Sequence, residues 1–409
     1  MFKNIYRNGG VEVCRDDILE FETKGCFSFF WNEVSMSENG YGLVKDSTCK
    51  LETHKNVSSI SSTGFGLCAI VIGVSRGYIS YEEGYERALK TLKNIYENAS
   101  HTKGFFNHFL NMETGKTIWD SEVSIIDTSI FIMGAMVASE YFMDEVTTYF
   151  EKLYRRIDWE FFREKDTNRF YMGYDIKNSK HFGQWDNYAE QLMMYFLGAS
   201  SPTHKINKEM FYDFDRNKIN YDGNEFIYSP FGSLFTYQFS HGFLDFKNKV
   251  DREGVNFFNN SKIATLLNRQ YCIENSNKHK SYNLKSWGIT PCETPTGYIG
   301  SLGIPPSLGL NTEDGTIGLY GFIASIVFLP EESIDSMNYI YHNFKDKLWG
   351  EYGFKDSYNL DENWFCDYEI GIDKGISMIM IENYRSELIW ELIMKNKYIK
   401  ESFAILEFY

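Results

Sequence analysis

The sequence has few of the residues that break helices or cross-link small folds. Only 7 of its 409 residues are proline, and its 7 cysteines form no C-x-x-C pair. An odd number of cysteines without such a pair argues against a disulfide framework or a zinc site, and is typical of reduced, mostly buried thiols. The 8 histidines show no ligand spacing such as H-x-x-x-H. We therefore expect no metal site.

A long apolar run is also missing. The longest, from Ile130 to Ala138, is far too short to cross a bilayer. The first residues, Met1 to Tyr6, lack the apolar core of a secretory signal. We expect a soluble, cytoplasmic protein that does not bind membranes, unless a leader has been removed from the chain.

Positive charge is scarce. With 41 Lys and Arg against 56 Asp and Glu, the formal net charge is −15, and an anionic surface repels phosphate backbones, so we expect no nucleic-acid partner. Aromatic residues, in contrast, are abundant: 29 Tyr, 34 Phe and 8 Trp. Aromatic rings stack on sugars but also fill cores, and their abundance alone favours the core.

Apolar residues recur at spacings of three and four through most of the chain, which predicts helices. The expected helices span 16–34, 62–77, 81–99, 121–143, 145–163, 187–198, 229–250, 254–274, 314–329, 331–346, 373–383 and 386–406. Helices that are apolar all round, such as 62–77, alternate with helices that carry a charged face, such as 81–99. This alternation predicts one all-α domain over 1–409, an (α/α)6 toroid in which six helical hairpins form two concentric rings.

Long loops rich in glycine and aromatic residues interrupt the expected helices at 100–120, 170–187, 275–314 and 347–372. Long ordered loops on a rigid scaffold usually carry function. No Ser/Pro-rich linker divides the chain, which supports a single domain.

Acidic residues stand where the loops enter the expected helices. Glu122 and Asp127 begin the helix at 121–143, five residues apart, so they do not share one helix face. Asp120 or Ser121 is the expected helix cap, with Glu122 complementing the helix dipole. Asp127 lies inside the apolar run, which favours a function or a buried hydrogen bond.

A second acidic residue, Glu190, follows Trp185 and Tyr188. Asn187 and Glu190 have the spacing of a capping box, which explains both polar residues without any function. A carboxylic acid among aromatic rings is poorly hydrated, however, which raises its pKa and keeps a proton available for donation. Both interpretations remain open.

The third, Asp373, begins the helix at 373–383 and is suited to be its N-cap. Glu382, Asn383 and Arg385 end the same apolar helix, which is an unusual density of polar groups for a core element. Two carboxylic acids from different helices can serve as proton donor and base for glycosidic cleavage, provided that they converge.

Several segments, taken in order, closely resemble one bacterial family. They are 63–67 (TGFGL), 109–115 (FLNMETG), 154–159 (YRRIDW), 198–204 (GASSPTH), 237–241 (YQFSH), 313–316 (EDGT) and 371–385 (GIDKGISMIMIENYR). The family is the glucoamylase-like family, which includes endo-β-1,2-glucanases and the glucan-processing domain of cyclic β-1,2-glucan synthases. The resemblance extends from about residue 15 to the end of the chain.

The resemblance implies an (α/α)6 barrel with an acidic cleft, and anomer-inverting hydrolysis of β-1,2-glucan without metal or cofactor. Glu190 matches the family's general acid, and Asp373 matches the base, which reaches its water through a relay. Glu122 and Asp127 match acidic residues of the cleft. The sugar-binding candidates that it implies are Gln238, His241, Asp314, Tyr384 and Arg385, with Trp119, Trp185, Tyr188 and Trp287 as aromatic candidates.

The sequence departs from the family at expected substrate contacts. The usual Asp-Gln-Gly-Pro is Asp373-Lys374-Gly375-Ile376 here, and 317–320 and 275–310 also diverge. Lys374 either lowers the pKa of Asp373 or points to solvent. These changes leave the glucan linkage and the chain length open.

Three hypotheses follow. The first is endo-acting, inverting hydrolysis of β-1,2-glucan or a related β-glucan. The second is exo-acting release of a mono- or disaccharide, or transfer to another sugar; an open cleft or a blocked pocket would separate these two. The third is a glycan-binding protein that has lost catalysis, against which the carboxylates of Glu190 and Asp373 argue. The sequence gives no oligomeric state.

Overall fold

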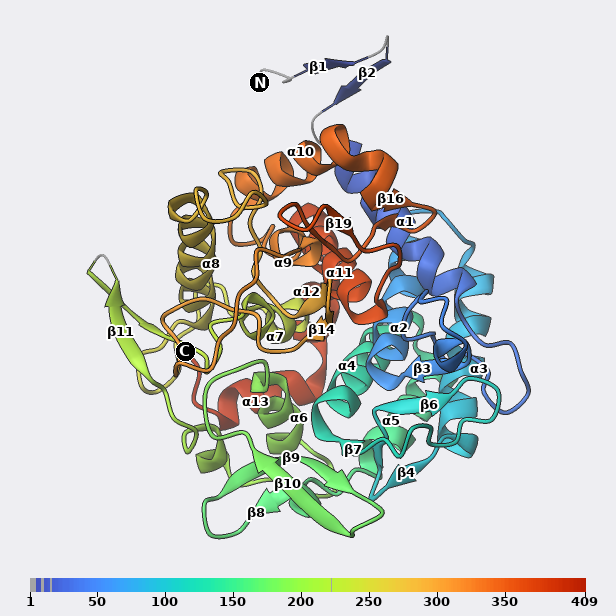
Figure 1. The fold of residues 1–409 in the computed structure, drawn as a ribbon. Coiled ribbons are helices and arrows are strands. Elements are labelled where there is room, and N and C mark those ends of the chain that lie inside the picture. The colour runs from blue at the N-terminus through green and yellow to red at the C-terminus, as the bar shows by residue number, and fades with distance from the viewer. Residues whose placement is uncertain (1–4, 9–10, 15–16, 222) are drawn as a thin grey trace.

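A computed structural model describes residues 5–8, 11–14, 17–221 and 223–409 and is mostly helical (Figure 1). The expected start of the first helix, residue 16, lies outside the described residues. The α-helices are α1 (Asp17–Asn32), α2 (Ile60–Ser75), α3 (Tyr81–Asn98), α4 (Ile125–Phe142), α5 (Asp144–Arg155), α6 (Leu192–Ala199), α7 (Phe239–Phe243), α8 (Phe257–Glu274), α9 (Leu319–Ile323), α10 (Pro330–Leu348), α11 (Gly371–Ser386), α12 (Leu388–Lys395) and α13 (Lys397–Ile405).

Fully buried helices alternate with half-buried ones, as predicted. Every residue of α6 is buried, and so is every residue of α2 from Ile60 to Gly73. The neighbouring helices α3 and α5 keep charged faces in solvent. Glycine lets α2 and α4 approach closely, since a Cβ atom on Gly134 would lie 2.0 Å from the carbonyl oxygen of Gly64. The arrangement as six hairpins stays a prediction.

Several expected helices are shorter than their apolar runs. The only helical parts of the segment 229–250 are a 3-10 turn, Leu234–Tyr237, and α7, and the only helix in the segment 314–329 is α9. The helix expected at 145–163 ends at Arg155, that at 187–198 begins only at Leu192, and 386–406 forms two helices. In a segment buried on all sides, the apolar pattern reports burial, and it does not distinguish a helix from an irregular turn.

Short β-strands within the loops make the all-α expectation too narrow. Three of them lead directly into buried helices: β3 (Val57–Ser59) into α2, β7 (Val123–Ser124) into α4, and β15 (Ile317–Gly318) into α9. Their antiparallel partners are β6 (Phe109–Asn111), β9 (Arg169–Asp175) and β18 (Ser357–Asn359). Loop segments are thereby fastened to the N-terminal ends of the inner helices.

The remaining strands form short ribbons or extend those pairs. They are β1 (Ile5–Asn8), β2 (Val11–Cys14), β4 (His101–Thr102), β5 (Phe105–Phe106), β8 (Arg163–Glu164), β10 (Lys180–Gln184), β11 (Lys218–Tyr221), β12 (Asn224–Ile227), β13 (Cys292–Thr294), β14 (Gly297–Ile299), β16 (Trp349–Gly350), β17 (Gly353–Phe354) and β19 (Trp364–Phe365). In Figure 1, β14 lies near the centre of the ring of helices.

The most apolar long helix belongs to the core. Among the described helices, α4 alone has the length and composition of a membrane span, and 83% of it is buried inside the protein. Such burial is typical of the core helix of a globular domain. The cysteines whose side chains are described, at 26, 49, 68, 272, 292 and 366, are free thiols.

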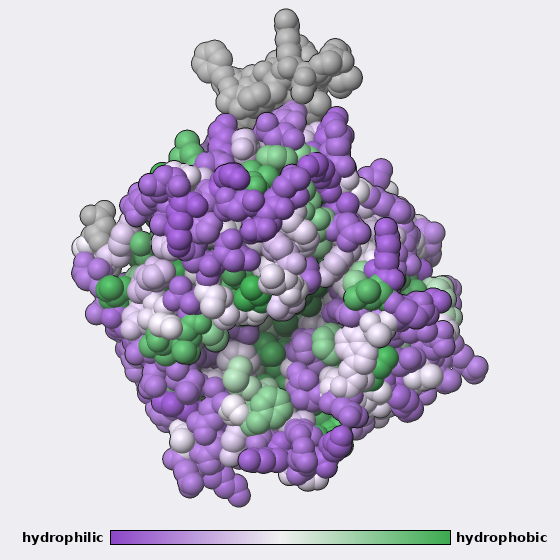
Figure 2. Space-filling view, in the orientation of Figure 1, coloured by the Kyte–Doolittle hydropathy of each residue, from purple (hydrophilic) through white to green (hydrophobic). Residues whose placement is uncertain are grey.

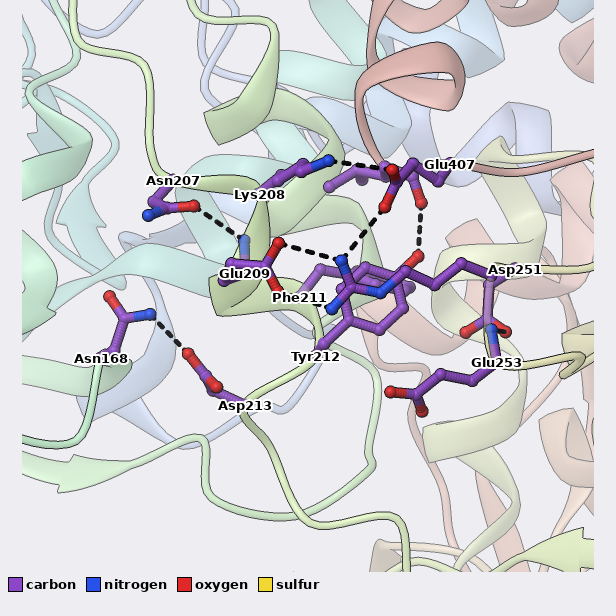
Figure 3. Close-up of polar contacts among 12 residues, drawn as sticks. Asn168, Asn207, Lys208, Glu209, Phe211, Tyr212, Asp213, Asp251, Glu253 and Glu407 are labelled. Atoms are coloured by element: carbon purple, nitrogen blue, oxygen red, sulfur yellow. Dashed lines mark hydrogen bonds and ion pairs between the residues drawn. The ribbon is translucent and has the colours of Figure 1, made fainter.

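A polar network near the end of the chain holds the segment 207–216 to the C-terminal residues (Figure 3). Arg252 pairs with Glu209 at 2.5 Å and with Glu407 at 3.1 Å. Arg216 pairs with the buried Asp251 at 2.6 Å. These ion pairs include none of the candidate site residues and have a structural role.

Candidate active site

One cavity collects side chains from the ends of several buried helices. Its volume is about 230 Å³, and it is lined by Ser61, His108, Ile126, Asp127, Ile130, Glu190, Phe235, Phe239, Pro291, Tyr298, Gly300, Tyr320 and Ile372. Figure 2 shows that the face carrying β14 is hollowed near its centre. The cavity combines apolar walls with a few carboxylates, as sites for small molecules and sugars do.

Glu190 lies in the turn that precedes α6 and lines this cavity. The turn is held by Gln191, whose side chain accepts a hydrogen bond from the Ala189 amide and donates one to the Asn187 carbonyl oxygen, both at 2.7 Å. The capping box that the spacing allowed does not form, because the helix begins only at Leu192, and Gln191 occupies the N-cap position without a side-chain cap bond. Burial raises the pKa of Glu190 to about 7, and the charge of Asp127 adds to the rise.

Asp127 stands in the first turn of α4 and lines the same cavity. The cap of α4 is Ser124, not Asp120 or Ser121: the Asp127 amide donates to Ser124 Oγ at 3.2 Å, and Ser124 Oγ donates to Asp127 Oδ2 at 2.6 Å. The buried hydrogen bond expected for Asp127 is thus present, and its second oxygen, Oδ1, lies 3.8 Å from His108 Nε2.

His108 joins Asp127 to Glu122. Its Nδ1 lies 3.2 Å from Glu122 Oε1, so Glu122 and Asp127 meet at one imidazole even though they are five residues apart. The sequence-based argument against a shared helix face fails because Glu122 precedes α4 and is not helical. Burial lowers the pKa of His108, but the carboxylates of Asp127, Glu122 and Asp46 outweigh it and raise the pKa to about 9.

Asp373 lies in the first turn of α11, and its side chain is 6% exposed. It is not the N-cap, which is Ile370. Instead it faces Asp356, and the two carboxyl groups are within hydrogen-bonding reach. Burial and the charge of Asp356 raise the pKa of Asp373 well above its usual value, and burial raises that of Asp356 to about 6.

Asp373 and Asp356 line a second space of only about 10 Å³, beside the larger cavity. Tyr320 lines both spaces, which are therefore adjacent. Its hydroxyl group is fixed by hydrogen bonds to the Pro291 carbonyl oxygen at 2.9 Å and Thr290 Oγ1 at 2.8 Å.

Lys374 neither points to solvent nor depresses the pKa of Asp373 below its usual value. It is 4% exposed, and its Nζ pairs with Glu22 Oε1 on α1 at 2.5 Å and donates to the Phe354 carbonyl oxygen at 3.0 Å. Its charge lowers the pKa of Asp373 only as the smallest of several influences, and burial and Asp356 outweigh it.

Trp119 is the aromatic candidate that remains accessible. It is 45% exposed, and its ring packs edge-on against Phe109, with centroids 5.2 Å apart. Phe109 in turn stacks on His108, with centroids 3.9 Å apart. Trp119 therefore lies on the His108 side of the site, where a sugar can reach its ring.

Five other sugar-binding candidates are buried and belong to the core. They are Trp185 (6% exposed), Tyr188 (0%), Gln238 (0%), His241 (1%) and Trp287 (0%). Gln238 donates to the Gly321 carbonyl oxygen at 2.8 Å, and His241 Nε2 lies 2.9 Å from Ser261 Oγ. Tyr188 stacks on Phe257. Their surfaces are covered by protein in this structure, so their contact with sugar stays a prediction.

Tyr384 and Arg385 lie at the far end of α11. They are 11 and 12 residues after Asp373, which corresponds to about 17 Å along a helix, so their predicted place in the same site is wrong. Arg385 pairs with Glu20 at 2.7 Å, and Glu382 pairs with Arg76 at 2.6 Å. The polar cluster that ends this helix therefore fastens it to its neighbours.

Asp314 does not line the 230 Å³ cavity. It is half-buried in the loop before β15, and its Oδ1 accepts a hydrogen bond from the Thr316 amide at 2.9 Å. This contact closes a local turn, which accounts for the side chain without sugar binding.

The sequence-based candidates omit four residues of the site: Asp46, His108, Tyr298 and Asp356. Asp46, His108 and Asp356 lie in loops and Tyr298 lies in β14, all outside the helix starts on which the acidic candidates were chosen. His108 immediately precedes the 109–115 segment, and Asp356 and Tyr298 lie within the 347–372 and 275–314 loops, so the glycine-rich loops did indicate the correct regions. Within the described residues, no group of three or more His, Cys, Asp or Glu could hold a metal ion.

Comparison with known proteins places this site in a family. A family model described as "Glycoamylase: Putative glucoamylase" matches residues 182–397, more than half of the chain. A curated relative from Parabacteroides distasonis, an exo β-1,2-glucooligosaccharide sophorohydrolase acting at the non-reducing end, is 27% identical over 93% of this chain. The chain spans 56% of that relative's length.

Solved structures match along nearly the whole chain. A structure from Bacteroides uniformis, described as a putative glucoamylase, is 29% identical with a TM-score of 0.88, and covers 98% of both chains. An endo-β-1,2-glucanase from Chitinophaga pinensis, solved with sophorotriose and glucose, is 27% identical with a TM-score of 0.87, over 97% of this chain and 99% of that one. The resemblance seen in the sequence is confirmed: this chain belongs to the Glycoamylase family.

Proposed function

We propose that this chain is a glycoside hydrolase that cleaves β-1,2-linked glucan, with Glu190 as general acid and Asp373 as general base. The observation that carries the proposal is Glu190, which lines the 230 Å³ cavity and has a pKa of about 7. An acid with that pKa retains its proton in a large fraction of molecules at neutral pH, as donation to a leaving oxygen requires. Two relatives support the linkage, because the sophorohydrolase from Parabacteroides distasonis and the endo-β-1,2-glucanase from Chitinophaga pinensis are both named for β-1,2-linked glucans.

The proposed reaction is an inverting hydrolysis. Glu190 donates its proton to the glycosidic oxygen while the bond from that oxygen to the anomeric carbon breaks. A water molecule attacks the anomeric carbon from the opposite face and loses a proton towards Asp373. Two carboxyl groups with separate roles and room for a water between them are what this mechanism needs.

Asp373 stands back from the larger cavity. Tyr320 and Ile372 line that cavity, whereas Asp373 lines the small space behind Tyr320. A proton from the attacking water therefore passes through an intermediate hydroxyl or water before it reaches Asp373. This placement supports the relay that the family resemblance implies.

Substrate binding falls to the accessible groups around the cavity. Glu122, Asp127 and His108 offer charged hydrogen-bonding partners for sugar hydroxyls, and Trp119 offers an exposed ring. We also infer that the buried and half-buried helices form the six hairpins of an (α/α)6 toroid around this cavity. A cytoplasmic location and the lack of nucleic-acid and membrane partners stay predictions.

Exo action is the second candidate, favoured by one feature of the site. Tyr298, in the ribbon of β13 and β14, lines the cavity and lies close enough to Asp373 and Asp356 to interact with them electrostatically. A ribbon over one end of the cavity limits how far a glucan chain can extend there. An endo enzyme releases a ladder of oligosaccharides from linear β-1,2-glucan from the first minutes, and an exo enzyme releases one short product.

Substitution of the two acids tests hydrolysis. Glu190→Gln and Asp373→Asn should each lower kcat on linear β-1,2-glucan by at least about 100-fold, with the circular-dichroism spectrum unchanged. Glu145→Gln, on the exposed face of α5, is a matched control and should retain wild-type activity. Anomeric NMR of the first products tests inversion. Substantial activity in both acid variants, or binding of the glucan by intact protein without any turnover, contradicts the proposal.

A further inference from the structure

Asp356 is a buried carboxylate held rigidly beside the proposed base. It lies between β17 and β18 and is 4% exposed. Its backbone amide donates to the Tyr368 carbonyl oxygen at 3.1 Å, and its carbonyl oxygen accepts from the Leu319 amide at 2.9 Å. Its Oδ2 accepts from the Glu293 amide at 2.8 Å and from Ser357 Oγ at 3.1 Å. The side chain therefore has one fixed orientation.

The other oxygen of this carboxylate lacks a donor, and the Asp373 carboxyl group lies beside the same side chain. Asp356 Oδ1 is buried, and no N–H or O–H group of the described residues donates to it. A buried carboxylate oxygen without a donor destabilises the folded protein. A proton on the neighbouring carboxyl of Asp373 supplies the missing donor, which explains why the two carboxyl groups can lie together out of water.

Within the described part of the chain, no Lys or Arg forms an ion pair with either carboxyl group. Lys374 is the closest candidate, but Glu22 and the Phe354 carbonyl oxygen already engage its ammonium group. The other titratable groups that act on the pair are Asp46, Cys292, Glu293, Tyr298, Tyr320, Cys366 and Tyr368. The two acids among them add negative charge, and the thiols and phenols are neutral because burial raises their pKa values. Because two negative charges on neighbouring buried carboxyl groups repel each other, the pair retains one proton.

We propose that Asp356 and Asp373 hold one proton between them and act together as a single base, with Asp356 as the residue that positions and tunes Asp373. This inference rests on the proposed hydrolysis. The pair starts with one negative charge, takes the proton that the attacking water loses, and ends neutral. Glu190 ends ionised after protonating the leaving oxygen, and a proton then returns from the pair to Glu190 through solvent, so that the cycle closes.

The small space beside the pair supports this role. Its volume of about 10 Å³ is close to what one water molecule occupies, and Tyr320 separates it from the larger cavity. One water there would connect the shared carboxyl groups to the cavity. A single fixed carboxylate without its partner would be a weaker base, since nothing but burial would hold its pKa up.

The pH profile of Asp356→Asn tests the pair. The new amide keeps the acceptor for the Glu293 amide but removes the shared charge. In the wild type, kcat should fall on the acidic side as the pair becomes neutral near pH 6. In the variant that limb should move to about pH 5 or lower, and kcat at the optimum should fall about 10-fold. A purely structural residue would change stability and leave the limb in place.

Two further measurements separate the possible failures. Asp251→Asn is the matched control, because it removes another buried aspartate that accepts backbone amides, at 2.9 and 3.0 Å from the amides of Val255 and Glu253; it should lower the melting temperature without moving the acidic limb. Infrared difference spectra need no turnover: Glu190→Gln should keep a protonated-carboxyl band at pH 8 that the double variant with Asp356→Asn loses.

Each outcome decides one of the two proposals. If the wild type cleaves glucan but Asp356→Asn has the wild-type limb and the band persists in the double variant, the shared base is contradicted and the hydrolysis stands. If Asp373→Asn remains fully active, the assignment of the base fails. If the wild type cleaves no β-1,2-glucan, the proposed function fails, and the infrared band still shows whether the two carboxyl groups share a proton.

Discussion

At the scale of single residues, burial of the Glu190 carboxyl group lowers the stability of the folded protein at neutral pH and keeps a proton available for catalysis. Its pKa is raised to about 7 by burial, from about 4.3 in an unfolded chain. The folded protein therefore binds a proton more tightly than the unfolded chain between these values, and its stability falls as the pH rises from about 4 to 7.

Glu190→Gln should remove this pH-dependent cost. We expect the variant to be more stable than the wild type at pH 8, by roughly 1–3 kcal/mol, and equally stable at pH 4. Urea unfolding of both proteins at the two pH values measures the difference. An equal or lower stability of the variant at pH 8 would show that the carboxyl group is not strained by burial, and would remove the reason for its role as an acid.

Sequence patterns located the acidic residues of the site but not the residues that contact them. Glu190 was ambiguous between capping and catalysis, because a capping box and a catalytic acid need the same residue types before a helix. The structure removes the capping-box interpretation, because Gln191, and not Asn187, occupies the N-cap position of α6. His108 and Asp356 carry no helical periodicity, and they reach the site only because strand pairing and loop closure bring them there, so local spacing could not identify them.

At the scale of elements, the buried pair of Lys374 and Glu22 fastens α11 to α1. The two side chains are 5% and 1% exposed, and Glu22 Oε2 also accepts a hydrogen bond from the Phe354 amide at 2.9 Å. An ion pair this deeply buried adds little net stability, but the loss of one partner leaves an uncompensated charge in the interior. The pair therefore behaves as a single unit.

Lys374→Met should destabilise the protein by about 3–5 kcal/mol. The double variant with Glu22→Gln should recover a large part of that loss, since no buried charge then lacks its partner. The unfolding midpoints of the wild type, both single variants and the double variant give the coupling energy. Additive losses would mean that the two charges do not depend on each other, contrary to their 2.5 Å contact.

The predicted helix ranges were accurate for helices that have one solvent-exposed face and one buried face. The amphipathic helices α3 and α10 lie within a residue or two of their predicted ranges, because charged residues mark their exposed side. The segments around α7 and α9 are buried on every side, and the pattern there predicts helices much longer than the five-residue helices that form. Interior segments of a large core can satisfy burial with turns, which sequence periodicity cannot show.

At the scale of the whole molecule, the N-terminal ends of buried helices bring carboxyl groups to one cavity and to the small space beside it. Asp127 lies in the first turn of α4, Asp373 in the first turn of α11, and Glu190 immediately before α6. Helix dipoles favour negative charge at these positions, but burial raises the pKa of Glu190 and Asp373 nonetheless. Their convergence depends on closure of the whole helical ring, and only the family resemblance anticipated it.

The same closure leaves one rim of the site exposed, and Trp119 occupies it. Trp119 and Asp120 both adopt left-handed backbone conformations, with φ values of 60° and 51°. Such conformations cost about 1–3 kcal/mol each in a residue other than glycine, and they hold the Trp119 ring 45% exposed beside Phe109. A strained backbone that presents an apolar ring to solvent suits the binding of a ligand better than stability.

Trp119→Ala should therefore weaken the binding of long glucans without unfolding the protein. We expect KM for linear β-1,2-glucan to rise about 10-fold, equivalent to about 1.4 kcal/mol, while kcat changes little. Oligosaccharides too short to reach from Glu190 past His108 to the ring should keep the wild-type KM. Steady-state kinetics over a series of chain lengths would locate the ring along the substrate. An equal effect on every chain length would place Trp119 beside the cleaved bond instead, and no effect on any would leave its exposed ring without a role in binding.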